Sequence, residues 1–376
     1  MGNQELVEFV TLPAPHTANI TRMTSPLVEL RDVERLSTRV IRVLGGNPGK
    51  SCVVNGVLWD NFKPRCAGHT VLEVLGRIGG WGSAPILLWG LLFPLHLEVH
   101  VARWKKPILD PSLQPNGLLG SNTYLVGTGR ERLLIDTGEG KPAWIAALKE
   151  VLGKENATIS RTLITHWHHD HQGGINDLSE LSPATSIHKN EPGEGQRDVW
   201  DGQRFQVEGA TLRAVFSPGH TSDHMALVLE EEDAMFTGDN VLGHGTAVFE
   251  DLPVYLDSLE KMRSHFRGRA YPGHGSIIED GPSKILEYIK HRQMRESQVV
   301  RILESPKSSA GVGVASEPDG WTSMDIVQVI YKDVPEKLHL AANGGILQIL
   351  RKLEAEDQVV ADSASEQWRW KNRAAL

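Results

Sequence analysis

His166-Trp167-His168-His169-Asp170-His171 directly follows an apolar run, residues 162–165, that is typical of a buried β-strand. Counted from His166, three of the four histidines stand at i, i+2 and i+5, and an aspartate stands at i+4. Histidine is the commonest transition-metal ligand, and a set of histidine and aspartate without thiolate suits Zn²⁺ or a similar ion. A solvated histidine-rich loop is the alternative interpretation. The recurrence of similar residues further along the chain disfavours it.

Three later segments repeat one arrangement, in which a strand-like apolar run leads into a turn of small residues with a histidine or aspartate at its tip. These segments are residues 215–221 with His220, residues 234–240 with Asp239, and residues 270–275 with His274. In each segment a glycine allows the backbone to turn sharply, so that the polar side chain can point to a shared edge of the sheets. Four loops that end in this way predict one common site.

The composition is that of a globular protein of 376 residues, which is long enough for two domains or for one large domain with an appendage. Its 47 acidic and 39 basic residues give a formal net charge of −8, which disfavours a broad nucleic-acid-binding surface. The two cysteines, Cys52 and Cys66, exclude a disulfide framework and a cysteine-rich zinc site. Residues 1–30 lack the basic start and apolar core of a secretory signal, so we expect a cytoplasmic protein.

Strand-like and helix-like segments alternate in two successive blocks, which is the pattern of a layered α/β sandwich. Strands are expected at residues 40–44, 121–126, 132–136, 161–165, 185–188, 203–207, 211–216, 224–229, 234–236 and 358–360. Helices are expected at residues 142–152, 175–181, 253–266, 282–303, 323–331 and 338–354. A linker rich in Ser, Gly and Pro at residues 305–318 precedes the last two helices.

These patterns divide the chain into an N-terminal arm (1–38), a main α/β domain (39–304), a C-terminal helical module (319–360) and a flexible tail (361–376). Residues 51–115 are atypical of the main domain, and residues 78–97 carry no formal charge. A stretch of that length could cross a membrane, but its glycines and prolines disfavour a continuous helix. Three interpretations stay open, namely a membrane helix, a buried or surface-docked insertion, and a retained intron. The membrane helix is the least favoured.

The HxHxDH string, the Pro-Gly-His turn ending at His220, the Thr-Gly-Asp turn ending at Asp239 and the Pro-Gly-His turn ending at His274, in this order, resemble the metallo-β-lactamase superfamily. The resemblance covers residues 40–50 and 116–300. It implies an αββα sandwich with a dinuclear zinc site at one edge, and therefore two Zn²⁺ per chain. In that family pattern, residues 51–115 have no counterpart.

Matching motif positions imply the ligands of the two zinc ions. The first zinc would be held by His166, His168 and His220, the second by Asp170, His171 and His274, and Asp239 would bridge them. His169 is the unmatched position of the string, and we expect it to lie behind the ligands or in solvent.

The chemistry implied by two zinc ions is hydrolysis or acyl transfer. Such a pair lowers the pKa of a shared water towards 7 and polarises a carbonyl or phosphoryl oxygen. In the family that the chain resembles, the aspartate of the HxHxDH string is usually described as a zinc ligand. It is also described as the group that accepts and returns the proton of the nucleophile. Asp170 is therefore the expected general acid/base.

A closer resemblance narrows the substrate. Residues 120–129, 134–139, 165–174, 223–226 and 243–252 resemble the lactamase-like branch with a small C-terminal winged-helix-like module. One group in that branch comprises fungal thioesterases that release aromatic polyketides from the acyl carrier protein of a non-reducing polyketide synthase, by hydrolysis or coupled cyclisation. Another group comprises endoribonucleases that cut single-stranded RNA.

The net charge of −8 favours the thioesterase over the ribonuclease, because an RNA backbone demands clustered Lys and Arg. The expected partner is an acyl carrier protein with its bound acyl chain, and no nucleic-acid partner is favoured. The ribonuclease remains the first alternative, and a glyoxalase-type thioester hydrolase the second. A purely binding role is disfavoured because all seven candidate ligands are present. The helix at residues 338–354 carries little positive charge, so we expect the C-terminal module to wall one side of the site.

Overall fold

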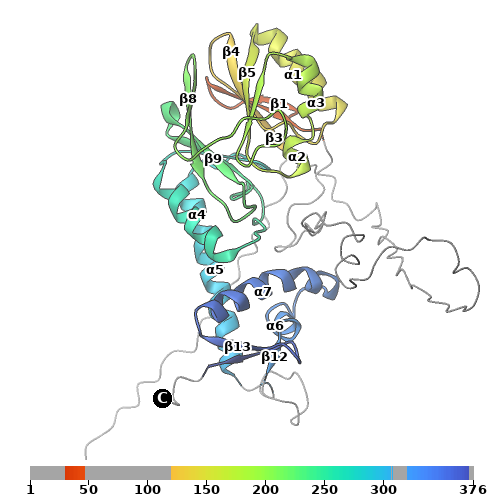
Figure 1. Cartoon of the computed structure of the whole chain (residues 1–376), viewed down its shortest axis with the longest axis vertical. Helices are drawn as coiled ribbons and strands as arrows, with labels where there is room; N and C mark the ends of the chain where they lie inside the picture. The colour runs from red at the N-terminus through yellow and green to blue at the C-terminus, as the bar shows by residue number, and fades with distance from the viewer. Residues whose placement is uncertain (1–29, 47–119, 306, 308–319, 372–376) are drawn as a thin grey trace, which may run out of the picture. The chain divides into compact units, whose positions relative to one another are not determined.

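The computed structural model describes residues 30–46, 120–305, 307 and 320–371, which form two main sheets with flanking helices and a smaller C-terminal sheet (Figure 1). The atypical stretch 51–115, most of the predicted arm 1–38 and nearly all of the linker lie outside these residues. Within the described ranges, no helix is long and apolar enough to span a lipid bilayer.

The first main sheet has six strands in the order β1-β2-β3-β4-β5-β6. The strands are β1 (Val33–Arg35), β2 (Val40–Leu44), β3 (Asn122–Val126), β4 (Glu131–Ile135), β5 (Thr158–Ile164) and β6 (Ser186–Lys189). Strands β1 to β4 pair antiparallel, whereas β4 with β5 and β5 with β6 pair parallel. The parallel pairs need crossover connections, which contain α1 (Pro142–Glu155) and α3 (Ile175–Leu181).

The second main sheet has five strands in the order β11-β10-β9-β8-β7. The strands are β7 (Arg204–Val207), β8 (Ala210–Phe216), β9 (Met225–Leu229), β10 (Ala234–Gly238) and β11 (Ala270–Pro272), and a 3-10 turn, η2 (Glu230–Glu232), joins β9 to β10. Only β10 and β11 pair parallel, and α4 (Leu252–Ser264) lies between them in the sequence. Helix α5 (Gly281–Glu304) follows β11.

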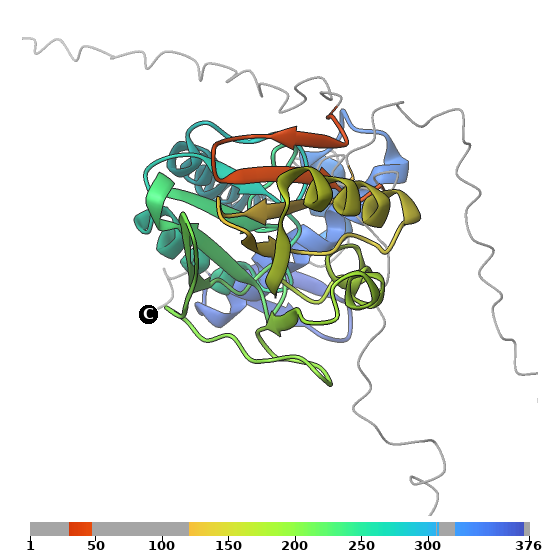
Figure 2. The ribbon, with the colours of Figure 1, turned by 90° about the horizontal axis from the view of Figure 1, so that it is seen from above.

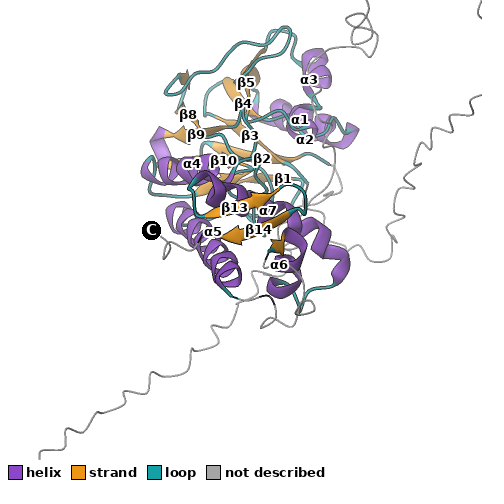
Figure 3. Cartoon of the chain, turned by 60° about the horizontal axis from the view of Figure 1, so that its bottom comes forward, coloured by secondary structure: helices purple, strands orange, loops and turns teal. Residues whose placement is uncertain are grey.

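Alternate residues along the strands belong to different cores, which explains the layered order. On β4, Leu133 and Ile135 lie in the core between the two sheets, whereas Leu134 packs with α1 residues such as Trp144. On β9, Leu227 lies between the sheets, and its neighbours on the other face pack against α4 and α5. The strands lie between α1 and α3 on one side and α4 and α5 on the other (Figure 3). The predicted αββα sandwich is confirmed.

The N-terminal arm predicted to reach residue 38 is wrong at its end, because Val33–Arg35 forms β1. This strand has no apolar alternation of its own and exists by pairing with β2, for example Val33 opposite Val43. The side chain of Ser37 accepts hydrogen bonds from the backbone N–H groups of Arg39 and Val40, which closes the turn between the strands. Figure 2 shows β1 and β2 side by side in red.

The C-terminal module combines helices with a small sheet. It contains α6 (Ser323–Ile330), η4 (Glu336–Leu338), α7 (His339–Ala355), β12 (Trp321–Thr322), β13 (Val359–Asp362) and β14 (Gln367–Trp370), with strand order β12-β14-β13. The predicted strand at residues 358–360 corresponds to β13, but the prediction of a flexible tail at residues 361–376 is wrong over residues 361–370. Trp368 and Trp370 pack on the module core and hold β14 in place. Their alternation with Gln367 and Arg369 is the sequence pattern that indicates this strand.

Candidate metal centre

The candidate site lies where several strands end at one edge of the two sheets. Strand β5 ends at Ile164, and the chain then turns through α2 (His169–Gln172), a single helical turn that carries Asp170 and His171. His220 follows β8, and Asp239 follows the last residue of β10. His274 follows β11 in the same way. The structure therefore brings together residues from four loops.

Three imidazoles form the first group. The His166 Nε2 atom lies 2.9 Å from His168 Nδ1, and the His220 Nε2 atom lies 3.1 Å from the same nitrogen. His166 is fully buried, and His220 is 8% exposed. His220 Nδ1 donates to the backbone oxygen of Val248 at 2.7 Å, which leaves Nε2 as the lone-pair atom facing the group. These three nitrogens could hold one metal ion.

Two imidazoles and a carboxylate form the second group. The Nε2 atoms of His171 and His274 are 3.3 Å apart, and Asp170 Oδ2 lies 3.1 Å from His274 Nε2 and 3.6 Å from His171 Nε2. His171 is fully buried, whereas the Asp170 side chain is 34% exposed. The second group therefore opens to solvent on the side of Asp170.

Asp239 lies between the two groups. Its Oδ2 atom is 3.3 Å from His274 Nε2 and 3.8 Å from His220 Nε2, and its Oδ1 atom is 3.5 Å from His171 Nε2. The carboxylate is 5% exposed, and Oδ1 has no hydrogen-bond partner among the described residues. One side chain therefore reaches ligand atoms of both groups, which is the geometry of a bridging carboxylate.

Two glycines allow the loops to approach this closely. A Cβ atom on Gly273 would lie 2.2 Å from Asp239 Oδ1 and 2.9 Å from His171 Cε1, so any larger residue would fill the space between the ligands. Gly219 adopts φ +128°, a conformation that side chains rarely tolerate, and a Cβ there would meet the backbone of Tyr255 at 2.4 Å. The glycine of each turn is therefore required by the local geometry.

Asp136 fixes the orientation of His171 from behind. Its Oδ2 atom accepts from His171 Nδ1 at 2.8 Å and from the hydroxyl of Thr165 at 2.9 Å, and its Oδ1 atom accepts from the Thr165 N–H at 2.8 Å. Asp136 follows β4 and adopts φ 59°. Hydrogen bonding of one imidazole nitrogen to a carboxylate selects the tautomer whose other nitrogen can bind a metal.

His224 fixes the backbone that carries Asp239. Its Nε2 atom accepts from the Asp239 N–H at 3.1 Å, and its Nδ1 atom lies 3.0 Å from the hydroxyl oxygen of Ser217. The ring is fully buried. Burial, and then the nearby His220, lower the pKa of His224 well below its usual range, so the ring stays neutral and can accept this hydrogen bond.

Burial lowers the pKa values of the imidazoles in the first group. Burial and the neighbouring His171 hold the pKa of His166 well below its usual range, and burial with the neighbouring His220 lowers that of His168 to about 3. The pKa of His220 is lowered chiefly by burial. Metal binding requires unprotonated imidazole, so this group is in its binding form at neutral pH.

The second group carries the opposite charge balance. Burial alone would lower the pKa of His171, but the carboxylates of Asp239, Asp170 and Asp136 outweigh it and raise that pKa well above its usual range. Burial would raise the pKa of Asp170, but the neighbouring His171 and His274 outweigh burial and lower it. Asp170 and Asp239 are therefore ionised at neutral pH, and His171 is protonated until a metal ion displaces its proton.

We expect metal-free protein to show this difference directly. In ¹⁵N spectra of the imidazole rings, His171 is expected to remain doubly protonated above pH 7, while His166 and His168 remain neutral down to pH 5. Replacing Asp136 with asparagine is expected to lower the pKa of His171, because one of its three anionic neighbours is lost. A His171 ring that loses its proton below pH 6 in the wild-type protein would contradict this charge balance.

The two groups fit metal ions of the size of Zn²⁺. Ligand atoms arranged tetrahedrally about 2.1 Å from an ion are separated by roughly 3.4 Å. The closest contacts within the groups are 2.9 to 3.3 Å, between nitrogens that would repel one another if all were unprotonated with nothing between them. Nitrogen and carboxylate donors without thiolate suit zinc or a similar borderline ion.

All seven predicted ligands lie in these groups, whereas His169 is exposed and belongs to neither. Sequence reasoning did not assign a role to Asp136, His224 or Ser121, whose hydroxyl donates to Asp170 Oδ2 at 3.0 Å. Asp136 could have been found, because it also stands directly after a strand. His224 directly precedes β9, and its role depends on a contact with Asp239, 15 residues away, that no local pattern predicts.

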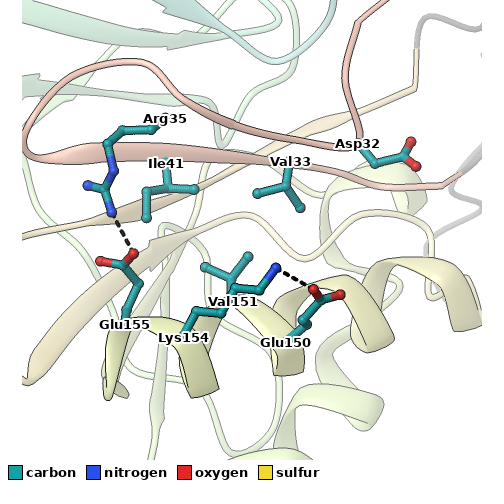
Figure 4. A pocket seen from close by; sticks show the side chains of 8 residues that line it. All are labelled: Asp32, Val33, Arg35, Ile41, Glu150, Val151, Lys154 and Glu155. Carbon is teal, nitrogen blue, oxygen red and sulfur yellow. Dashed lines mark hydrogen bonds and ion pairs between the residues drawn. The ribbon is translucent and has the colours of Figure 1, made fainter.

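A shallow cavity of about 310 Å³ lies between β1, β2 and α1 and includes none of these residues (Figure 4). It is lined by Asp32, Val33, Arg35, Ile41, Glu150, Val151, Lys154 and Glu155. Its charged groups pair with one another, as Arg35 does with Glu155 and Lys154 with Glu150. This cavity is therefore a weaker candidate for a metal or catalytic site than the group of histidines.

Two family patterns match the chain. Residues 116–274 match the family described as the metallo-beta-lactamase superfamily, and residues 322–368 match the beta-lactamase associated winged helix domain. The first match includes all seven candidate ligands. The second covers the C-terminal module with its three-stranded sheet.

Several fungal proteins are similar over most of the chain. The lactamase-like protein aptB of Emericella nidulans is 46% identical over 71% of this chain and 87% of its own length. A protein of Aspergillus chevalieri named atrochrysone carboxyl ACP thioesterase is 46% identical over 67% of this chain and 82% of its own length. A protein of the same name from Aspergillus fumigatus is 37% identical over 92% of this chain and 72% of its own length.

Solved structures support the fold alone. A beta-lactamase domain protein from Burkholderia ambifaria superposes with a TM-score of 0.56 at 17% identity, covering 66% of this chain and 87% of its own. A metallo-beta-lactamase family protein from Thermus thermophilus superposes with a TM-score of 0.52 at 21% identity, covering 67% of this chain and 94% of its own.

Proposed function

Because the chain belongs to the metallo-β-lactamase superfamily, we propose that it is a zinc-dependent thioesterase that releases an aromatic polyketide from an acyl carrier protein. The observation that supports the chemistry is the pair of adjacent His/Asp groups that share Asp239. The relatives named atrochrysone carboxyl ACP thioesterase, at 46% and 37% identity, support the substrate class and the carrier protein as partner.

We propose that each group binds one Zn²⁺, held by His166, His168 and His220 and by Asp170, His171 and His274, with Asp239 shared. A pair of zinc ions supplies hydroxide at neutral pH and polarises the carbonyl of a thioester. The residues behind the ligands hold them in place, as Asp136 does for His171 and His224 does for the Asp239 backbone.

Asp170 is the proposed general acid/base. Its carboxylate is ionised, faces the open side of the site and is oriented by the Ser121 hydroxyl. In hydrolysis, the water oxygen forms a bond to the thioester carbon, the carbon–sulfur bond breaks, and Asp170 takes the water proton and returns it to the departing thiolate. The products are a carboxylic acid and a free thiol. In a coupled cyclisation, a carbanion of the same acyl chain takes the place of water.

The proposed function predicts that purified protein loaded with zinc hydrolyses an acyl thioester on an acyl carrier protein and leaves single-stranded RNA intact. The measurement follows the release of free thiol and of acid, with the RNA incubated in parallel. Removal of metal by a chelator should stop thiol release, and added Zn²⁺ should restore it. Cleavage of the RNA together with an untouched thioester would favour the ribonuclease alternative. A content below one zinc per chain under metal-replete conditions would contradict the proposed zinc centre.

A further inference from the structure

Helix α5 carries one histidine and two arginines that have no role in the proposed thioester hydrolysis. His291, Arg292 and Arg295 lie within five positions of one another, and all three side chains are partly buried. Arginines three positions apart on a helix are neighbours in space, so their charges repel. Such an arrangement destabilises the folded state unless a negatively charged group offsets the repulsion.

Arg292 lies against the loop that contacts the metal centre. Its guanidinium carbon is 4.8 Å from the ring centroid of Phe249, and its Nη2 atom donates to the backbone oxygen of Ala247 at 2.7 Å. The next residue, Val248, accepts the hydrogen bond from His220 Nδ1. Arg292 is thus linked to a candidate zinc ligand through two adjacent peptide groups.

Arg295 is held in a similar way by the C-terminal module. Its guanidinium carbon is 4.5 Å from the ring centroid of Tyr331, and its Nη1 atom donates to Gln298 Oε1 at 3.0 Å. In both arginines an aromatic ring supports the guanidinium plane. Stacking of this kind restricts the side chain while leaving N–H groups at the edge of the plane able to donate.

Neither arginine has a carboxylate partner among the described residues. Glu296, the acidic residue next to Arg295 in the helix, pairs instead with Lys352 at 2.7 Å. The two Nε atoms are buried and have no hydrogen-bond partner in the described part of the chain. Burial, and then the charges of Arg292 and Arg295, lower the pKa of His291 to about 4, so this ring is neutral at pH 7.

We propose that Arg292 and Arg295 bind the phosphodiester of the 4′-phosphopantetheine arm that carries the acyl chain on the carrier protein. This inference rests on the proposed function. A phosphodiester offers two anionic oxygens that the planar guanidinium of arginine can contact through paired N–H groups, and it supplies a negative charge. Arg292, through Ala247 and Val248, places this charge beside the loop that holds His220, so an arm bound there can lead its thioester to the metal centre.

One phosphodiester fits these observations better than an RNA strand. Binding to RNA normally engages several phosphates along a basic surface, whereas the chain has a net charge of −8 and this group contains two permanent charges. A carrier-bound arm brings one phosphodiester and one thioester on the same flexible chain. The two arginines are therefore matched to a single phosphate.

The test compares two thioesters with the same acyl group, one on 4′-phosphopantetheine and one on pantetheine, which lacks the phosphate. In Arg295→Gln we expect KM for the phosphorylated thioester to rise by roughly tenfold or more, because a charge-assisted hydrogen bond is lost. We expect kcat, and all constants for the pantetheine thioester, to stay at wild-type values. Arg295→Lys, which keeps the charge but not the fork, should show a smaller rise.

Lys290→Gln is the matched control, because it removes an exposed positive charge from the same helix. It should leave KM for both thioesters unchanged. Equal losses on both thioesters in Arg295→Gln, or no loss on either, would overturn the inference and indicate a structural role for the contact with Tyr331. Weaker binding of single-stranded RNA with unchanged thioester kinetics would also overturn it. A wild-type protein that hydrolyses neither thioester would overturn the proposed function, and this inference with it.

Discussion

Replacing Asp170 with asparagine is expected to lower kcat for thioester hydrolysis by roughly 10²- to 10⁴-fold, which is the usual contribution of a positioned general acid/base. Asparagine has nearly the same shape and keeps an oxygen that can face a metal ion, but it cannot accept a proton at neutral pH. His171 and His274 lower the Asp170 pKa despite burial, so the wild-type carboxylate is ionised at neutral pH and has an oxygen free of a proton. We therefore expect a loss in kcat larger than any change in KM.

Zinc content must be measured on the same samples, so that loss of a proton acceptor is distinguished from loss of a metal ion. His169→Gln is the matched control, because His169 lies next to Asp170 in the chain but is exposed and outside both groups of ligands. It should retain wild-type kcat and zinc content. Thioester turnover that survives Asp170→Asn unchanged would remove Asp170 from the proposed proton transfer. A drop in zinc content in parallel with kcat would assign Asp170 to metal binding alone.

Replacing Asp239 with alanine is expected to reduce the zinc content from two ions per chain to one or none, and to lower kcat/KM by roughly 10³-fold or more. The reason is its place between the groups, 3.3 Å from His274 Nε2 and 3.8 Å from His220 Nε2. Without this carboxylate, two ions would lie close together with less negative charge between them. Their mutual repulsion would then weaken the binding of both.

The measurement is elemental analysis after dialysis against a defined free zinc concentration, followed by kinetics on the same preparation. Asp257→Ala is the control, since it removes an exposed carboxylate from α4 without any contact to the ligands. Thermal unfolding should be recorded for each variant, because a bound ion stabilises the folded state by mass action. An Asp239→Ala protein with two zinc ions and full activity would refute the bridging role.

Much of the fold follows from local patterns. The apolar periodicity and proline near residue 142 predict a helix over residues 142–152, and the structure has Pro142–Glu155. The helix predicted at 282–303 is Gly281–Glu304. These elements could be predicted because helix spacing, an N-terminal proline and a capping aspartate such as Asp280 all act within a few residues of one another.

Two short strands that depend on pairing with another strand are not predicted by local patterns. The exposed strand Val33–Arg35 has no sequence pattern of its own and forms because β2 offers an edge. The sequence predicts a flexible tail where the structure has β14, although Trp368 and Trp370 alternate with polar residues. Strand β13 is its hairpin neighbour, but the pairing with β12, more than 40 residues away, is a long-range contact.

The sequence by itself determined the family, the layered fold and the types of donor at the candidate site, because each donor stands at the end of its own strand within a short recognisable turn. The tertiary structure alone decided how these donors meet. His171 and His274 are 103 residues apart in the chain, yet their Nε2 atoms lie 3.3 Å apart. It also decided that Asp136 orients His171, that His224 holds the Asp239 backbone, and that Arg292 donates to the loop that contacts His220. Such contacts depend on the packing of whole sheets and helices, and local sequence periodicity does not predict them.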